Sequence, residues 1–216
     1  MVYLFGHKQV TGYRKNKERK VKEMKENLLR ETQQAHRKPF SCNIVLIGFM
    51  GAGKSTVSEY LSSKYDMDTV EMDQIIAERE KMSISDIFSV YGEEYFRDLE
   101  TNLLIEMQTR TNTVISCGGG VPMRERNVKE MKKNGCVVLL TATPETILER
   151  VKDNHDRPLL EGNKTVSYIS ELMEKRRAKY EAAADVIIKT DGKNTREICE
   201  ELIQKMEGGS RIWSRE

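Results

Sequence analysis

Short runs of apolar residues recur along the chain, and more polar segments with helical periodicity lie between them. Five of these runs have the length and the near-continuous hydrophobicity of strands that are buried on both faces of a sheet. They cover residues 42–47, 68–72, 113–117, 137–140 and 186–189. The first of them reads CNIVLI. The pattern therefore predicts five short, buried strands.

The intervening segments place apolar residues three and four positions apart, which predicts helices. In segment 54–65, for example, Val57, Tyr60 and Leu61 share one helical face. The predicted helices cover residues 54–65, 74–81, 83–90, 93–109, 125–133, 144–151, 167–184 and 195–206. Strands that alternate with helices in this way predict an α/β fold, with a five-stranded parallel sheet and helices on both of its faces.

The composition is that of a folded domain without membrane spans. Of the 216 residues, 38% are hydrophobic and 32% are charged, and no stretch approaches the roughly 18 apolar residues of a spanning helix. The four cysteines are scattered and form no C-x-x-C pair. This spacing argues against a zinc site and against a disulfide framework, so we expect a reducing, cytoplasmic location.

Charge is divided unevenly along the chain. Residues 1–40 carry eleven Lys and Arg against four Glu, a net charge of +7, whereas the other 176 residues carry 25 basic and 30 acidic side chains, a net charge of −5. Pro39 ends any helix before Phe40. We therefore divide the chain into a basic N-terminal extension at 1–40, a folded domain at 41–206 and a flexible tail at 207–216.

The basic extension has a helix-favouring composition but only a thin apolar stripe, formed by Val21, Met24 and Leu28. This narrow stripe favours a solvated helix over one that packs into a core. A contact with a second copy or another partner stays open as an alternative. Nucleic-acid or anionic-membrane binding is weakly supported, because the basic run has no aromatic interleaving. We expect a monomer and assign the extension no catalytic role.

The clearest motif is a phosphate-binding loop. The segment GFMGAGKS at 48–55 matches G-x-x-x-x-G-K-[ST] at every fixed position, between a predicted buried strand and a predicted helix. Glycines let backbone N–H groups surround phosphate oxygens, and the helix N-terminus adds its positive dipole end. The motif predicts binding of a nucleoside triphosphate. The residues expected at the nucleotide are Gly48, Gly51, Ala52, Gly53, Lys54, Ser55 and Thr56.

Two acidic residues at the end of the second predicted strand are candidates for metal and acceptor chemistry. The Ser55 hydroxyl is expected to ligate Mg²⁺. The third strand ends without the Asp that many phosphate-loop proteins place there for the metal, which leaves Glu71 and Asp73. The carboxyl edge of a parallel sheet binds ligands. We therefore expect Glu71 to serve the metal through water and Asp73 to face the acceptor hydroxyl, although helix capping is an alternative for Asp73.

Three further segments are candidates for the acceptor pocket. Glu93, Arg97 and Glu100 fall on one helical face, where Glu100 can orient the Arg97 guanidinium toward a carboxylate. A surface ion-pair ladder is the alternative for these three. The glycines at 118–120 directly follow a strand and suggest backbone close to a ligand. The loop at about 153–162 contains Arg157 before Pro158 and is long enough to act as a lid.

Together these segments resemble the shikimate kinases over about residues 43–206. The resemblance depends on GFMGAGKST, EMD, GEEYFRDLE, CGGG, RPLL and MEKRRAKY, which follow one another in this order. It implies a phosphate-loop kinase core with a lid loop. It also implies ATP-dependent phosphorylation of the 3-hydroxyl of shikimate, in aromatic amino-acid biosynthesis, with ATP and shikimate as the bound partners and Mg²⁺ as cofactor.

The same resemblance implies a role for each matching residue. Lys54, Asp73 and Arg157 match the catalytic set, in which Asp73 is the candidate base and Arg157 is the lid arginine near the transferred phosphate. Arg150 matches an arginine that packs on adenine, and Lys193 aligns with a second adenine-side position by loop spacing alone. The residues that match the shikimate site are Asp73, Arg97, Gly118, Gly119, Gly120 and Arg176.

One position departs from the family pattern, and two other functions compete with the one it implies. Glu71 stands where the family usually has Asp, which puts direct contact with the metal in doubt. A kinase for another small polyhydroxy acid such as gluconate shares the phosphate loop, but RPLL after GGG and the two arginines favour shikimate. An inactive nucleotide-binding regulatory domain is the second alternative, and the presence of Lys54, Asp73 and Arg157 argues against it.

Overall fold

The computed structural model describes residues 42–152 and 165–208, together with Lys25, which is helical and exposed. The rest of the basic extension, the predicted lid at 153–162 with Arg157, and the tail from 209 onward lie outside the described residues. The chain divides into two compact units, Met1–Lys38 and Pro39–Glu216. Every described strand belongs to the second unit.

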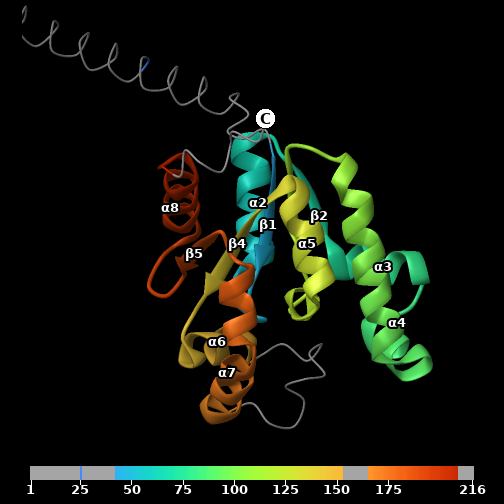
Figure 1. The fold of residues 1–216 in the computed structure, drawn as a ribbon. Helices are drawn as coiled ribbons and strands as arrows, with labels where there is room; N and C mark the ends of the chain where they lie inside the picture. Colours follow the sequence, from blue (N-terminus) through green and yellow to red (C-terminus); the bar gives the residue numbers. More distant parts are fainter. Residues whose placement is uncertain (1–24, 26–41, 153–164, 209–216) are drawn as a thin grey trace, which may run out of the picture. The chain divides into compact units, whose positions relative to one another are not determined.

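Five parallel strands form one sheet in the order β2-β3-β1-β4-β5 (Figure 1). Central β1 pairs with β3 on one side and with β4 on the other. Because all the strands run in the same direction, their carboxyl ends meet at one edge of the sheet. The predicted parallel sheet is confirmed. Its strands are β1 (Asn43–Ile47), β2 (Asp68–Glu71), β3 (Thr113–Ser116), β4 (Gly135–Thr141) and β5 (Val186–Lys189).

Helices cover both faces of the sheet because successive strand side chains point to opposite sides. Ile44 of β1 packs into a core cluster with α2, α6 and α8, whereas its neighbour Val45 packs into a second cluster with α3, α4 and α5. Helix α7 contributes Ile169 to the first cluster and Tyr180 to the second. The helices are α2 (Lys54–Tyr65), α3 (Met72–Glu80), α4 (Ile84–Glu106), α5 (Glu125–Asn134), α6 (Pro144–Val151), α7 (Val166–Ala183) and α8 (Thr195–Gly208).

The boundary between β2 and α3 differs from the prediction. The strand ends at Glu71 and the helix begins at Met72, so Asp73 lies in the first turn of α3. The Met72 side chain is fully buried and therefore continues the apolar pattern of the strand. This is why the sequence pattern extends the strand by one residue.

Helix α4 joins the two helices predicted at 83–90 and 93–109. Gly92 has non-helical dihedral angles, φ 82° and ψ 171°, and produces a kink where the prediction left a gap. Ser83 caps the helix by accepting a hydrogen bond from the Asp86 backbone N–H at 3.1 Å. The last predicted turn forms a separate 3₁₀ helix, Met107–Thr109. No helix in the described part of the chain is long and apolar enough to cross a membrane.

Candidate functional site

The phosphate-binding loop connects β1 to α2 at the carboxyl edge of the sheet. Three of its glycines have positive φ angles, and at two of them a Cβ would also clash with neighbouring atoms. Gly48 has φ 145°, and a Cβ there would lie 2.4 Å from the Leu140 carbonyl oxygen. Gly51 has φ 76°, and its Cβ would lie 2.8 Å from Val151 Cγ1. The loop is thus packed against β4 and α6, and its backbone can approach a ligand without side chains intervening.

The residues that follow within the loop are placed for phosphate binding. Gly53 precedes the first turn of α2 in a left-handed conformation, Ala52 is buried, and Ser55 and Thr56 are exposed. The Lys54 Nζ donates to the Gly48 carbonyl at 3.0 Å and to the Phe49 carbonyl at 3.3 Å. This ammonium group therefore lies over the loop, at the point where phosphate oxygens can replace carbonyls as its partners.

Glu71 and Ser55 are in direct contact beside the loop. The Ser55 hydroxyl donates to Glu71 Oε2 at 3.0 Å, and Glu71 Oε1 is buried with no hydrogen-bond partner among the described residues. An unpaired buried carboxylate oxygen is costly, so it indicates a ligand or a bound water. The pair joins the first turn of α2 to the end of β2, and the metal roles of the two residues stay predictions.

Asp73 faces a second buried carboxylate across the glycine segment. A Cβ on Gly118 would lie 2.5 Å from Asp73 Oδ1 and 2.9 Å from Glu100 Oε1. Neither of these two oxygens has a hydrogen-bond partner in the described residues, and both are buried. The first turn of α3, helix α4 and the segment after β3 therefore converge at Gly118. Free carboxylate oxygens at this point can accept hydrogen bonds from hydroxyl groups.

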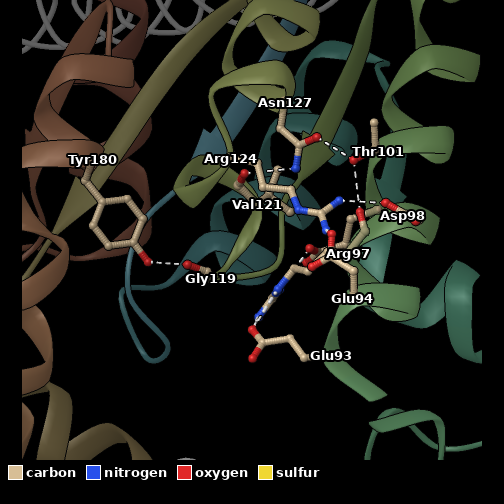
Figure 2. Close-up of polar contacts among 11 residues, drawn as sticks. Glu93, Glu94, Arg97, Asp98, Thr101, Gly119, Val121, Arg124, Asn127 and Tyr180 are labelled. Carbon is tan, nitrogen blue, oxygen red and sulfur yellow. Dashed lines mark hydrogen bonds and ion pairs between the residues drawn. The ribbon is translucent and has the colours of Figure 1, made fainter. Parts of the chain in front are cut away.

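Arg97 is fixed by two glutamates of its own helix, of which Glu93 is labelled in Figure 2. Its Nη1 donates to Glu100 Oε2 at 2.8 Å, and its Nη2 donates to Glu93 Oε1 at 2.9 Å. The guanidinium also lies 5.4 Å from the centroid of the Phe96 ring, and a Cβ on Gly120 would lie 2.1 Å from Nη1. The surface ion-pair alternative is wrong, because Glu100 is fully buried and Arg97 lies against the glycine segment.

Arg176 approaches the same glycine segment from α7. Its guanidinium lies 5.8 Å from the centroid of the Phe49 ring, and its Nη1 is 3.8 Å from the position of a Cβ on Gly119. Gly119 also lies close to the Gly48 carbonyl of the phosphate loop. Two arginines from different helices thus border one glycine segment, which in turn borders the phosphate loop. A small anion between them can contact both charges.

The two residues predicted at the adenine lie near the end of β5. Arg150 donates to the Gly51 carbonyl at 3.1 Å and to Thr190 Oγ1 at 3.0 Å, so it connects the phosphate loop to the segment after β5. Lys193 donates to the Lys189 carbonyl at 2.9 Å and pairs with Glu201. Arg150 thus contacts the phosphate loop directly, whereas Lys193 lies at the end of β5. The adenine roles of both residues stay predictions.

A protein-family model described as shikimate kinase matches residues 50–207. A shikimate kinase of Persephonella marina is 43% identical over 164 residues, which cover 76% of this chain and 98% of the relative. The chain belongs to the shikimate kinase family. A structure of the shikimate kinase from Acinetobacter baumannii in complex with shikimate has a TM-score of 0.73 at 30% identity, and covers 78% of this chain and 94% of that chain.

The comparison with a gluconokinase bears on the first alternative function. The structure of that enzyme from Sinorhizobium meliloti has a TM-score of 0.51 at 18% identity, and covers 83% of this chain and 100% of that chain. This level of identity reflects a shared fold alone. The family expected from the sequence is confirmed, and gluconate is not favoured as the acceptor.

Within this shikimate kinase fold, Glu100 occupies an unusual electrostatic environment. Burial raises the pKa of its carboxyl to about 7, the Arg97 guanidinium opposes that rise, and Asp73 adds to it. Nearby Cys117 is also fully buried, and burial raises the pKa of its thiol far above the ordinary range. We therefore expect Cys117 to be inert, whereas Glu100 is poised to change its charge near neutral pH.

The raised pKa of Glu100 predicts that the stability of the folded protein depends on pH. Its pKa is about 7 in the folded protein against an ordinary value of 4.5, so the folded state binds the proton more tightly. The stabilisation is complete below pH 4.5 and is lost as the pH rises through 7. We expect the free energy of unfolding of the wild type, relative to Glu100→Gln, to fall by about 1–3 kcal/mol between pH 4.5 and 8. Urea unfolding of both proteins at several pH values measures this difference. A difference in the free energy of unfolding that stays constant across the range would contradict the prediction.

Two groups of supporting contacts could not be recognised in the sequence (Figure 2). Arg124, just after the glycine segment, pairs with Glu94 and Asp98 of α4. The Thr101 hydroxyl lies 2.9 Å from the Arg97 carbonyl and 2.7 Å from Asn127 Oδ1. The Asn127 side chain donates in turn to a third group, the Val121 carbonyl, at 3.0 Å.

The pairs of Arg124 with Glu94 and Asp98, and of Thr101 with Asn127, connect residues 26 to 30 positions apart. Helical spacing carries no signal of such pairs. They tie the helix that carries Arg97 to the turn that follows the glycines. The Tyr180 hydroxyl makes a similar link from α7, to the Gly119 carbonyl at 2.6 Å. The site is therefore supported from two sides of the glycine segment.

Proposed function

We propose that this chain transfers the γ-phosphoryl group of ATP to the 3-hydroxyl of shikimate, which yields shikimate 3-phosphate and ADP. The observation that carries the proposal is the convergence of Arg97, Arg176 and Asp73 on one glycine segment beside the phosphate loop. Shikimate is a small anion with one carboxylate and three hydroxyls. Two guanidinium groups match the carboxylate. The buried Oδ1 of Asp73, which has no partner among the described residues, matches a hydroxyl.

The residues act mainly by positioning and by neutralising charge, which is what phosphoryl transfer requires. Asp73 accepts the proton of the 3-hydroxyl as the hydroxyl oxygen attacks the γ-phosphorus and ADP leaves. Lys54 exchanges the loop carbonyls for oxygens of the β- and γ-phosphates. The backbone N–H groups of the loop, from Gly51 to Thr56, hold the same phosphates. Arg157, outside the described residues, is assigned to the transferred phosphoryl group on the family resemblance alone, as Arg150 and Lys193 are to adenine.

The donor set beside the loop fits Mg²⁺, which prefers a few protein oxygens together with water and phosphate oxygens. Ser55 would ligate the ion through its hydroxyl. Glu71, whose Oε2 accepts the hydrogen bond of that hydroxyl, would hold a metal-bound water through the partnerless Oε1. When bound, the ion would supply positive charge that neutralises the phosphate oxygens of ATP.

The acceptor is tested by a coupled ADP-release assay with Mg²⁺-ATP. Shikimate, gluconate and a control without acceptor are run in parallel, and the phosphorylated product is identified by mass spectrometry. We expect ADP release when shikimate is the acceptor and none with gluconate or without an acceptor. Turnover with gluconate but not with shikimate would favour the first alternative function. ATP binding without turnover of either acceptor would favour a regulatory domain.

Glu71 gives a prediction that is specific to this chain. We expect Glu71→Asp to retain most activity, because it keeps the charge, and Glu71→Ala to lose at least about tenfold in kcat at low Mg²⁺. Titration of Mg²⁺ separates the two variants, since the loss should shrink at high concentrations of the ion. Glu78→Ala, which removes an exposed acidic side chain of the following helix α3, is the control. Full activity of Glu71→Ala across the titration would remove Glu71 from the metal site.

We further propose a monomer that acts in the cytoplasm. The described cysteines are all free thiols, and three of them are buried, which suits a reducing compartment. Size-exclusion chromatography with light scattering tests the oligomeric state. The domain boundaries near residues 40 and 207 and the role of the basic extension also stay predictions.

A further inference from the structure

Tyr180 is a buried residue beside the glycine segment that has no part in the reaction proposed above. It stands one helical turn after Arg176 on α7, so the two side chains share a face of the helix. Its ring is 5% exposed and packs in the second core cluster, while its hydroxyl reaches out of the core to the glycine segment (Figure 2). A buried tyrosine hydroxyl normally has a specific partner.

The partner of the hydroxyl is backbone in the acceptor site. Tyr180 donates to the Gly119 carbonyl at 2.6 Å. At the position of a Cβ on Gly119, the nearest atoms are the Tyr180 hydroxyl at 3.5 Å and Arg176 Nη1 at 3.8 Å. The hydroxyl, the guanidinium and the glycine backbone therefore meet at one place. This hydrogen bond joins α7 directly to the segment that the acceptor is expected to contact.

The Tyr180 hydroxyl also interacts with the Arg176 charge. Burial raises the pKa of Tyr180, and the positive charge of the nearby Arg176 guanidinium acts against that rise. The same guanidinium lies 5.8 Å from the centroid of the Phe49 ring. A long arginine side chain loses considerable rotamer freedom when it is fixed. An aromatic ring and a fixed phenol oxygen beside the guanidinium remove that freedom before the acceptor binds.

We propose that Tyr180 is a positioning residue of the acceptor site, whose hydroxyl holds the Arg176 guanidinium against the glycine segment at Gly119. The inference depends on the proposed function, because it assigns Arg176 to the acceptor carboxylate. Tyr180 itself does not contact the reacting atoms. It contributes to the binding of the acceptor carboxylate, and it does not contribute to phosphoryl transfer.

The test is Tyr180→Phe in the full-length chain, since phenylalanine keeps the ring in the core and removes only the hydroxyl. We expect the KM for shikimate to rise roughly three- to tenfold, the loss expected for one hydrogen bond. The KM for ATP and kcat should change less than about twofold. Tyr168→Phe, a half-buried tyrosine on the same helix, is the matched control and should leave all three constants unchanged.

A second measurement separates positioning from a general loss of structure. Shikimate methyl ester keeps the hydroxyls and lacks the carboxylate charge. The ratio of kcat/KM for shikimate to that for the ester is taken within one preparation, so it does not depend on the folded fraction. We expect this ratio to fall in Tyr180→Phe by the same factor by which the KM rises. An unchanged ratio would overturn the proposal, even if the melting temperature fell.

A double-mutant cycle tests whether the effect passes through Arg176. In an Arg176→Ala background, Tyr180→Phe should change the KM for shikimate by less than about twofold. An equal effect in both backgrounds would overturn the proposal. Turnover of shikimate by the wild type tests the proposed function separately. If the wild type is active and the Tyr180 variant is normal, only this inference fails.

Discussion

Asp73→Asn is expected to reduce kcat with shikimate by roughly 10²- to 10⁴-fold, the range for loss of a general base. The amide keeps the size of the side chain and can still accept one hydrogen bond, but it cannot take the proton of the 3-hydroxyl. Asp73 Oδ1 is buried beside Gly118 with no partner in the described part of the chain. The KM for ATP should stay within about twofold, because Asp73 does not belong to the phosphate loop. Initial rates of ADP release give both constants.

A matched control for this change is available at the start of the next helix. Asp86 lies in the first turn of α4, as Asp73 lies in the first turn of α3, and its carboxylate accepts a hydrogen bond from the exposed Ser83 hydroxyl at 2.7 Å. Asp86→Asn should retain full activity with at most a small loss of stability. If Asp73→Asn kept more than a tenth of the wild-type kcat, Asp73 would be a binding residue, and the base would have to be another group.

Gly120→Ala is expected to raise the KM for shikimate by roughly 10- to 100-fold, which corresponds to the loss of one charged contact. An added Cβ would lie 2.1 Å from Arg97 Nη1 and 2.3 Å from its Cζ. The backbone of Gly120, with φ −90° and ψ −17°, is compatible with alanine. The methyl group therefore displaces the end of a flexible side chain rather than straining the fold. The displaced Arg97 guanidinium therefore loses its contact with the acceptor and its ion pair with Glu100.

Gly208→Ala is the control for this substitution, because a Cβ at that position meets nothing within 4 Å. Kinetics with shikimate, together with thermal melting, distinguish a displaced arginine from an unfolded protein. Arg97→Ala should reproduce the KM of Gly120→Ala, and combining the two should add little. An unchanged KM in Gly120→Ala would show that Arg97 does not bind the acceptor.

Local patterns predicted a large part of this site because their geometry depends on a single loop or a single helix. The spacing in the phosphate loop implies the course of the backbone between β1 and α2. The i, i+3 and i, i+4 spacing around Arg97 correctly places Glu93 and Glu100 at its guanidinium. The near-continuous apolar runs predict strands buried on both faces, and from these follows a parallel sheet covered by helices on two sides. Among the described residues, the predicted elements differ from the structure at boundaries such as Met72 and at Gly92, where two predicted helices join.

The sequence by itself determined the fold class and the phosphate-binding loop, and by family resemblance the acceptor. Only the tertiary structure decided which distant groups meet. Asp73 of α3, Glu100 of α4 and Gly118 after β3 come together at one point, and Tyr180 reaches Gly119 across 61 positions of the chain. Such contacts depend on how helices pack against the sheet and on the strand order β2-β3-β1-β4-β5. Periodicity describes which face of an element is buried, but many packings of the same faces satisfy it, and each brings different polar groups together.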